Sequence, residues 1–301
     1  MRTQRSAYGL LILSMVSWGF ANPFSDIAME YFSPTHMLIV EVGAGALVLT
    51  AIALVRRISF SFPWKWAFIL GALEPGLTYF FGNVGYASGT VVTGLIIMSS
   101  EVLVLALLGW LILKEKINLI EGIAIAVGFS GALLVGWAAS SAGLGDIWSG
   151  LAFAMAALCA AGYAIAVRFF TTKNPTADIF AITWGQTVIA MMLGLIALPF
   201  TTSLSQTSQV LSQLPTQAWL AAIGAGIFGV AIPFLLFAEA ARFVPARHAA
   251  LSLNIIPVVG ISLGALLGRG LPTALQYVGG ALVLISLFAL TLVADEKKIS
   301  H

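Results

Sequence analysis

The apolar character of this chain constrains its fold more than any other feature. Apolar side chains make up 60% of the sequence, charged side chains only 9%, and the mean hydropathy is +1.02. Soluble proteins carry about 25% charged residues, so this chain cannot cover its apolar groups with a polar surface. A helix of about 20 apolar residues spans a bilayer core of about 30 Å, and no stretch alternates like the strands of a membrane barrel. The sequence therefore predicts an all-α integral membrane protein.

Ten membrane-spanning helices fit the apolar runs and the charges between them. The predicted helices cover residues 7–27, 34–55, 64–83, 89–113, 117–138, 147–168, 176–199, 216–241, 246–268 and 272–293. With this count, thirteen of the 14 Lys and Arg residues fall on one side of the membrane, and only Arg269 falls on the other. Basic connections favour the cytoplasm. We therefore expect a multi-pass protein with both termini in the cytoplasm.

The chain also contains a weak internal repeat. The stretch Leu108–Leu134 returns 155 residues later as Leu263–Ala289, with an apolar run, a short polar break and a second apolar run in each copy. An odd number of helices in each copy makes the two copies cross the bilayer in opposite directions. We predict two inverted five-helix repeats, at 1–140 and 141–301, which together form one transport domain with a substrate site near the membrane midplane.

Three carboxylates lie inside predicted helices, namely Glu41, Glu74 and Glu101. An ionised acid at the bilayer centre costs about 3 kcal/mol, so three would cost about 9 kcal/mol. Every Lys and Arg falls at or beyond a predicted helix end, so no buried cation is expected beside these acids. Either the acids are protonated for part of a cycle, or they line a watery cavity that a cation can enter. The alternative is that they form hydrogen bonds as neutral acids in helix packing.

Other polar and aromatic side chains lie deep in the predicted helices and are candidates for the lining of a substrate pocket. They are Trp18, Asn22, Tyr79, Trp184 and Asn254. Trp18 and Asn22 are four residues apart, so they share one face of a helix. The alternative role for such groups is to bridge neighbouring helices.

Two further acids lie near predicted helix ends. Glu115 stands between Lys114 and Lys116, which predicts a solvated turn. Glu239 precedes Arg242 by three residues, a spacing that favours an ion pair on a helix surface.

The sequence contains no pattern that points to an enzyme or to a bound cofactor. His36, His248 and His301 form no cluster that predicts a metal site. The single Cys159 has no partner for a disulfide. We found no nucleophile–base pair, phosphate-binding glycine loop or paired catalytic carboxylates. We therefore expect no enzyme activity, no cofactor and no nucleic-acid partner; the expected partners are the lipid bilayer, a small-molecule substrate and protons.

Several short motifs, taken in order, resemble those of the EamA-type family of the drug/metabolite transporter superfamily. The resemblance covers essentially the whole chain and is carried by Trp18-Gly19 with Asn22, Ser33-Pro34, Lys114-Glu115-Lys116, Pro257 and Gln276. It implies a ten-helix carrier of the bacterial inner membrane that moves amino acids or other small metabolites, often outward.

Three positions depart from the pattern of that family. Glu41 stands where an arginine is common, Gly270 replaces a glutamate, and Val102 beside Glu101 replaces a proline. A basic group is lost and acids are gained, which favours a substrate with an amine or a full positive charge.

The leading hypothesis is a secondary transporter that works by alternating access and exports amino acids or other amine-bearing metabolites, with protons as the coupling ion. Glu74 and Glu101 would form the centre that binds the proton or the amine, and Glu41 would lie toward the outer gate. The alternative is a multidrug efflux carrier for lipophilic cations. A membrane-embedded enzyme acting on lipids would need a His, Ser or metal constellation near one membrane face, and the sequence offers none.

Overall fold

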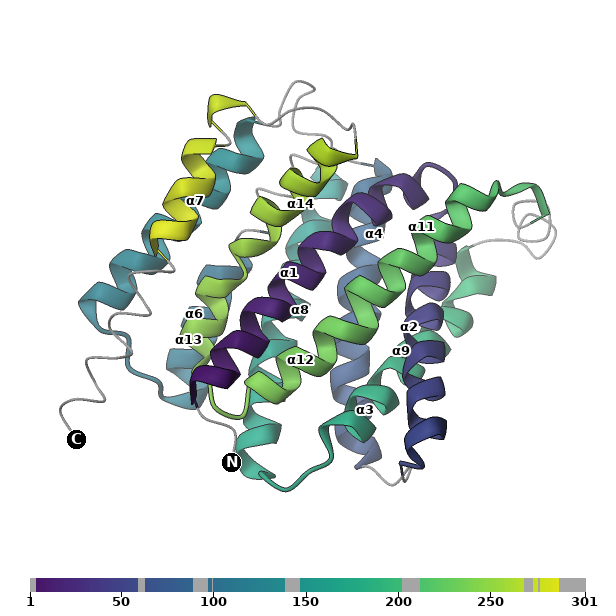
Figure 1. The fold of residues 1–301 in the computed structure, drawn as a ribbon, viewed down its shortest axis with the longest axis horizontal. Coiled ribbons are helices and arrows are strands. Elements are labelled where there is room, and N and C mark those ends of the chain that lie inside the picture. The colour runs from purple at the N-terminus through teal and green to yellow at the C-terminus, as the bar shows by residue number, and fades with distance from the viewer. Residues whose placement is uncertain are drawn as a thin grey trace.

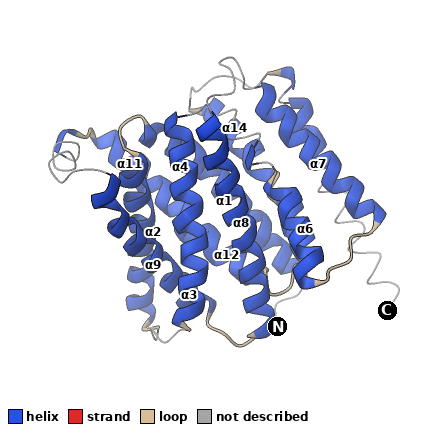
Figure 2. Cartoon of the chain, turned by 180° about the vertical axis from the view of Figure 1, so that it is seen from behind, coloured by secondary structure: helices blue, strands red, loops and turns tan. Residues whose placement is uncertain are grey.

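A computed structural model describes residues 4–58, 63–88, 97–98, 100–138, 147–201, 212–267, 273–275 and 277–286. Within these ranges every regular element is a helix, and the helices lie side by side in one bundle (Figures 1 and 2). The elements are α1 (Gln4–Met29), α2 (Pro34–Arg56), α3 (Trp64–Gly71), η1 (Ala72–Leu77), α4 (Thr78–Ser88), α6 (Glu101–Leu113), α7 (Leu119–Ala138), α8 (Ile147–Lys173), α9 (Ile179–Thr201), α11 (Thr216–Gly226), η2 (Ile227–Ala231), α12 (Ile232–Ala240), α13 (Ala246–Ser252), α14 (Ile255–Leu266) and a short helix at Tyr277–Ser286.

The prediction of an all-helical membrane protein is confirmed. In the described part of the chain, six helical segments are long and apolar enough to cross a membrane. They are Ser6–Met29, Pro34–Arg56, Trp148–Lys173, Ile179–Thr201, Thr216–Ala240 and Ala246–Leu266. The predicted helices at 89–113 and 272–293 extend beyond the described residues, so the count of ten stays a prediction.

Local sequence signals explain several helix ends. Ser33 is the N-cap of α2, where its hydroxyl accepts a hydrogen bond from the backbone N–H of His36, and Pro34 occupies the first turn. At the other end of α2, Arg57 adopts a left-handed conformation that terminates the helix.

Two of the predicted helices are interrupted near their middles by π-helical segments. The predicted helix 64–83 consists of α3, η1 and α4, and the predicted helix 216–241 consists of α11, η2 and α12. The first interruption follows from Pro75, because the residue before a proline disfavours the helical conformation; Glu74 is accordingly extended, with φ −151° and ψ 130°. Residue 227 begins η2 and residue 72 begins η1, and 227 − 72 = 155, the spacing of the sequence repeat.

Helices from before residue 140 and helices from after residue 141 pack closely against each other. Helix α1 contacts α11, α12 and α14, α2 contacts α9, and α4 contacts α8. Glycines permit the closest approaches: a Cβ on Gly226 would lie 2.2 Å from the carbonyl oxygen of Glu41, and a Cβ on Gly71 would lie 2.2 Å from that of Gln186. Close backbone approach at small residues is the usual way that helices pack in lipid. Gly226 thereby sets the position of the helix that carries Glu41.

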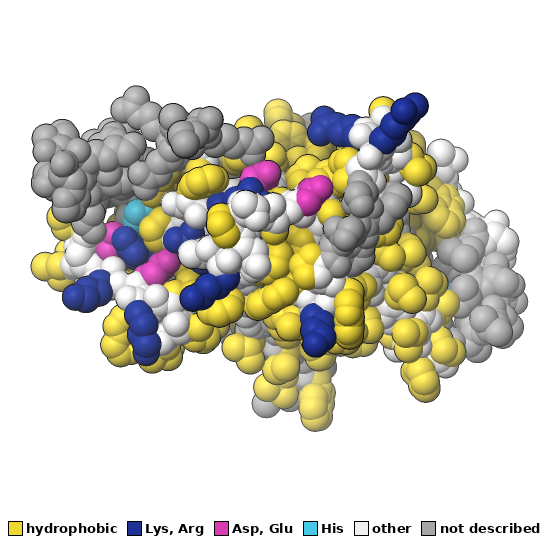
Figure 3. All heavy atoms as spheres, turned by 90° about the horizontal axis from the view of Figure 1, so that it is seen from below, with side chains coloured by type: hydrophobic (Ala, Val, Ile, Leu, Met, Phe, Trp, Pro, Cys, Tyr) yellow, Lys and Arg dark blue, Asp and Glu magenta, His cyan; other side chains and the backbone are white. Residues whose placement is uncertain are grey.

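The surface exposes many large apolar side chains. Five of the most exposed apolar side chains are Leu47, Val55, Leu119, Phe200 and Leu266, each at least 72% exposed. A soluble protein does not expose so much apolar surface. The end of the bundle near the N-terminus carries Lys and Arg side chains between apolar flanks (Figure 3).

Candidate functional site

A cavity of about 190 Å³ lies inside the bundle, and all three of the predicted intramembrane acids line it. Glu41 comes from α2, Glu74 from η1 and Glu101 from the first turn of α6. The rest of the wall includes Trp18, Asn22 and Ser25 from α1, Thr78, Tyr79, Asn83 and Tyr86 from α4, Phe153 and Tyr163 from α8, and Gly229, Phe237 and Ile256 from later helices. Residues from before position 140 and residues from after position 141 therefore form the cavity together.

The three acids differ in how they are held. Glu41 is 3% exposed, and its Oε1 accepts a hydrogen bond of 3.1 Å from Nδ2 of Asn83. Glu74 is 9% exposed, and within the described part of the chain neither Glu74 nor Glu101 has a protein partner for a hydrogen bond or an ion pair. None of the described residues that line the cavity is Lys, Arg or His. An acid that served only helix packing would bond to a neighbouring helix, and among the three only Glu41 does so.

The break in the helix at Glu74 is what directs this acid into the cavity. Because Glu74 is extended and Pro75 has no N–H, the carbonyl groups just before the break lose regular helix partners. The carbonyl oxygen of Leu73 instead accepts two hydrogen bonds from Thr78, one from its backbone N–H and one of 2.9 Å from its hydroxyl. Irregular backbone at membrane depth is tolerated where it lines a cavity.

A second carbonyl, on the opposite part of the chain, lies on the cavity wall beside two aromatic side chains. Pro233 has no N–H to donate to the carbonyl of Gly229, four residues earlier. Trp18 Nε1 donates to that carbonyl oxygen at 2.9 Å, and Tyr79 Oη donates to it at 2.5 Å. The two side chains also lie 3.2 Å apart at their polar atoms. Both aromatic rings are thus held in place by the helix break at η2.

The structure does not bring all the sequence candidates to the cavity. Trp18, Asn22 and Tyr79 line it. Trp184 lies elsewhere, where its Nε1 donates to Oγ1 of Thr50 at 2.8 Å between α9 and α2. Asn254 is 2% exposed and lies between α13 and α14, outside the cavity wall.

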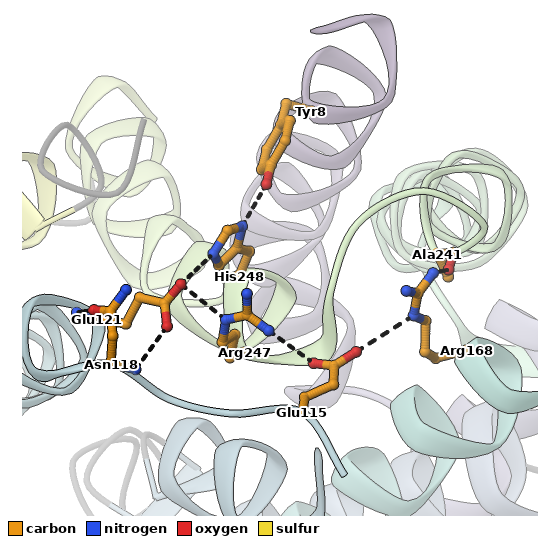
Figure 4. Close-up of polar contacts among 8 residues, drawn as sticks. All are labelled: Tyr8, Glu115, Asn118, Glu121, Arg168, Ala241, Arg247 and His248. Carbon is orange, nitrogen blue, oxygen red and sulfur yellow. Dashed lines mark hydrogen bonds and ion pairs between the residues drawn. The ribbon is translucent and has the colours of Figure 1, made fainter. Parts of the chain in front are cut away.

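A second polar cluster, which we call the ion-pair network, lies toward the N-terminal end of the bundle (Figure 4). Arg247 Nε lies 2.9 Å from Glu121 Oε1, and its Nη1 lies 3.6 Å from Glu115 Oε2. Arg168 Nε lies 3.6 Å from Glu115 Oε1. His248 contacts Glu121 at 3.3 Å and also bonds to the hydroxyl of Tyr8. The cluster links six residues, namely Tyr8, Glu115, Glu121, Arg168, Arg247 and His248.

Each ion pair of the network joins an acid from before residue 140 to a basic side chain from after residue 141. The expectation of a solvated turn at Glu115 is wrong, because this side chain is only 13% exposed and lies between two arginines. Glu121 is 1% exposed. A sequence signal for part of the network did exist: Asn118 and Glu121 exchange side chain to backbone bonds of 2.8 and 2.9 Å, which is a capping box at the start of α7.

The network and the cavity are separated along α1. Tyr8 belongs to the network and Trp18 to the cavity, and ten residues of helix span about 15 Å. The ion pair predicted at Glu239 and Arg242 is confirmed at 3.9 Å, and it lies outside the network.

These features define the class of the molecule: a multi-pass helical membrane protein with an acid-lined cavity inside its bundle. The chain belongs to the EamA-like transporter family, whose profile matches residues 5–137 and 147–292. It is therefore a membrane transporter rather than an enzyme, as the resemblance of its motifs implied.

Two relatives from Bacillus subtilis (strain 168) carry the name of uncharacterized transporters. YdfC is 22% identical over 270 residues, which cover 87% of this chain and 83% of the relative. YvbV is 22% identical over 279 residues, which cover 92% of this chain and 88% of the relative. A crystal structure of a protein that is 19% identical matches with a TM-score of 0.81, over 98% of this chain and 99% of that chain. At that identity the match shows the fold alone.

Proposed function

We propose that this transporter is a secondary carrier that binds small organic amines in the acid-lined cavity and works by alternating access. The observation that supports it most is the composition of the cavity wall, where Glu41, Glu74 and Glu101 face no described Lys, Arg or His. Unpaired acids inside a membrane protein mark ion or substrate pathways. An ammonium group that enters the cavity offsets the charge that the protein itself leaves unpaired.

The two moving parts would be the five-helix repeats at 1–140 and 141–301. The two separate family matches and the matched π-helical interruptions 155 residues apart support this division. In the arrangement described here the ion-pair network holds the repeats together at the N-terminal end of the bundle. For the cavity to open toward that end, the pairs of Glu115 and Glu121 with the second repeat would have to separate.

We assign the basic end of the bundle to the cytoplasm of a bacterium, with both termini there and the protein in the inner membrane. The positive-inside rule supports this orientation. We further propose export coupled to protons; the acids support the coupling, because a proton and an ammonium group would compete for the same carboxylates. Glu41, 3% exposed and nearer the predicted outer end of α2, would then act toward the outer gate.

Transport by purified protein in proteoliposomes tests this function. We expect Glu74→Gln and Glu101→Gln each to abolish or strongly reduce exchange of a labelled amine and to alter its pH dependence. Glu30→Gln, at an exposed acid beyond the end of α1, is the matched control and should leave exchange unchanged. If both cavity variants keep normal transport with a normal pH dependence, these acids are not the binding centre.

A multidrug carrier for lipophilic cations is the second candidate. It is favoured by the rings of Trp18, Tyr86, Phe153, Tyr163 and Phe237 on the cavity wall, since aromatic faces attract cations. The volume of about 190 Å³ argues against it, because pockets for drug-sized ligands have volumes of roughly 300–1,000 Å³. Overexpression should confer resistance to quaternary ammonium dyes if this candidate is correct, and should confer none if the metabolite candidate is correct.

A further inference from the structure

We infer that the cavity selects amines that carry no carboxylate, and so distinguishes a decarboxylated amine from the parent amino acid. This inference rests on the proposed function and narrows its substrate class. Amino acids and simple amines share the ammonium group that the three acids would bind. They differ in whether the cavity must also accept a negative charge.

The charge on the cavity wall disfavours a ligand carboxylate. Glu41, Glu74 and Glu101 are the charged side chains on the described wall, and the neighbouring stretch 89–99 contains no charged residue in its sequence. Of the described basic side chains, His36 is the most buried, at 4% exposed, and it bonds to the hydroxyl of Ser33 at the start of α2. Arg247 and His248 are engaged by Glu121 in the ion-pair network. If the carboxylate of a ligand lies about 6 Å from one ionised acid, at an effective dielectric constant of about 20, their repulsion weakens the binding of that ligand by about 100-fold.

The neutral donors of the wall do little to offset this repulsion. Four of the eight side-chain donors on the described wall are already used within the protein: the amide of Asn83 donates to Glu41, the hydroxyl of Thr78 donates to Leu73, and the polar atoms of Trp18 and Tyr79 donate to Gly229. The other four, on Asn22, Ser25, Tyr86 and Tyr163, are uncharged. A carboxylate is bound tightly where charged donors or several converging N–H groups meet it. The cavity has no such group among its described residues.

The same wall suits an organic cation better than a metal ion. Among the described residues, no three of His, Cys, Asp and Glu are grouped closely enough to hold a metal ion. The rings of Trp18, Tyr79, Tyr86 and Tyr163 are surfaces on which an alkylammonium group can pack. A cavity of about 190 Å³ has room for a short amine chain rather than for a drug-sized molecule.

Binding to the purified full-length protein, measured by calorimetry or by ligand-induced thermal stabilisation, tests the inference with three matched probes. Cadaverine and lysine differ only in the carboxylate, and lysine methyl ester has the bulk of lysine without its negative charge. We expect cadaverine and the ester to bind at least tenfold more tightly than lysine. In Glu74→Gln the preference for cadaverine over lysine should fall by at least threefold, while the same change at the exposed Glu30 should not affect it.

The possible failures separate this inference from the function on which it rests. If lysine binds as tightly as cadaverine and both need Glu74, the inference is overturned while the proposed amine carrier stands. If the ester fails together with lysine, size rather than charge excludes the amino acid, and the inference is again overturned. Absence of binding by all three probes, tested beside putrescine with ornithine and agmatine with arginine, would overturn the inference and the proposed function together.

Discussion

Removing the arginine at the centre of the ion-pair network should open the bundle at its N-terminal end. In Arg247→Met the side chain keeps much of its length but loses its charge. Glu121, 1% exposed, then loses its 2.9 Å partner, and Glu115 loses one of its two arginines. Because these pairs join the two proposed repeats, we expect the change to destabilise only the arrangement in which those repeats meet at this end.

The size of the effect follows from the burial of the pair. Removing one partner of a buried ion pair costs about 3–5 kcal/mol. Arg247 is 15% exposed, and Arg168 still pairs with Glu115, so we take the lower value, about 3 kcal/mol. This corresponds to a shift of about 100-fold in the equilibrium between the closed and open arrangements.

A cysteine placed between the network and the cavity reports this equilibrium. Leu11 on α1 is 1% exposed, and Cys159 is the only native cysteine, so Leu11→Cys in a Cys159→Ala background gives a single site. With Arg247→Met, a water-soluble maleimide supplied from the N-terminal side should react up to about 100-fold faster. Lys65→Met, at an exposed site on the same end, is the control. An unchanged rate in folded Arg247→Met protein would refute the role of the network as the closure.

Three further predictions concern the cavity and its supports. Trp18→Phe and Tyr79→Phe should each destabilise the protein little, because the other side chain still donates to the carbonyl of Gly229. The double variant removes both of these donors and should lower the free energy of unfolding by about 1–3 kcal/mol. Additive losses in a double-mutant cycle would contradict this. Gly226→Ala should lower the free energy of unfolding by about 1–3 kcal/mol, because the new Cβ meets the backbone of α2. Gly9→Ala is the control and should be neutral, because a Cβ at that position has no atom within 4 Å. Cadaverine binding should weaken as the pH falls, because protons and the amine compete for the three acids; calorimetry that finds binding unchanged or tighter at low pH would exclude this competition.

Sequence reasoning identified the three acids and the structure brings them to one cavity, because buried charge is expensive in lipid and therefore stands out in an apolar sequence. Pro75 and Pro233, which lie in the two interrupted helices and each lack a backbone donor, are likewise visible in the sequence. Neither inference needed information about which helices are neighbours.

The parts that sequence reasoning missed depend on helix rotation and on distant contacts. Trp184 lies at cavity depth by position, yet it bonds to Thr50 on another helix face. A helix that is apolar on all sides carries no periodic signal of which face meets a cavity. The network was missed because Arg247 and Glu121 are 126 positions apart, and each alone looks like a residue at an ordinary helix end.

The proposal that the substrate occupies the cavity lined by Glu41, Glu74 and Glu101 can be tested by chemical labelling. A hydrophobic carbodiimide modifies protonated carboxyl groups within membranes, and peptide mass spectrometry can locate and quantify each adduct. We expect adducts on at least one of these three acids. The rate of adduct formation should fall in proportion to the occupancy by cadaverine and should be unaffected by lysine at the same concentration. Adduct formation on all three acids that is unchanged at saturating cadaverine would contradict it.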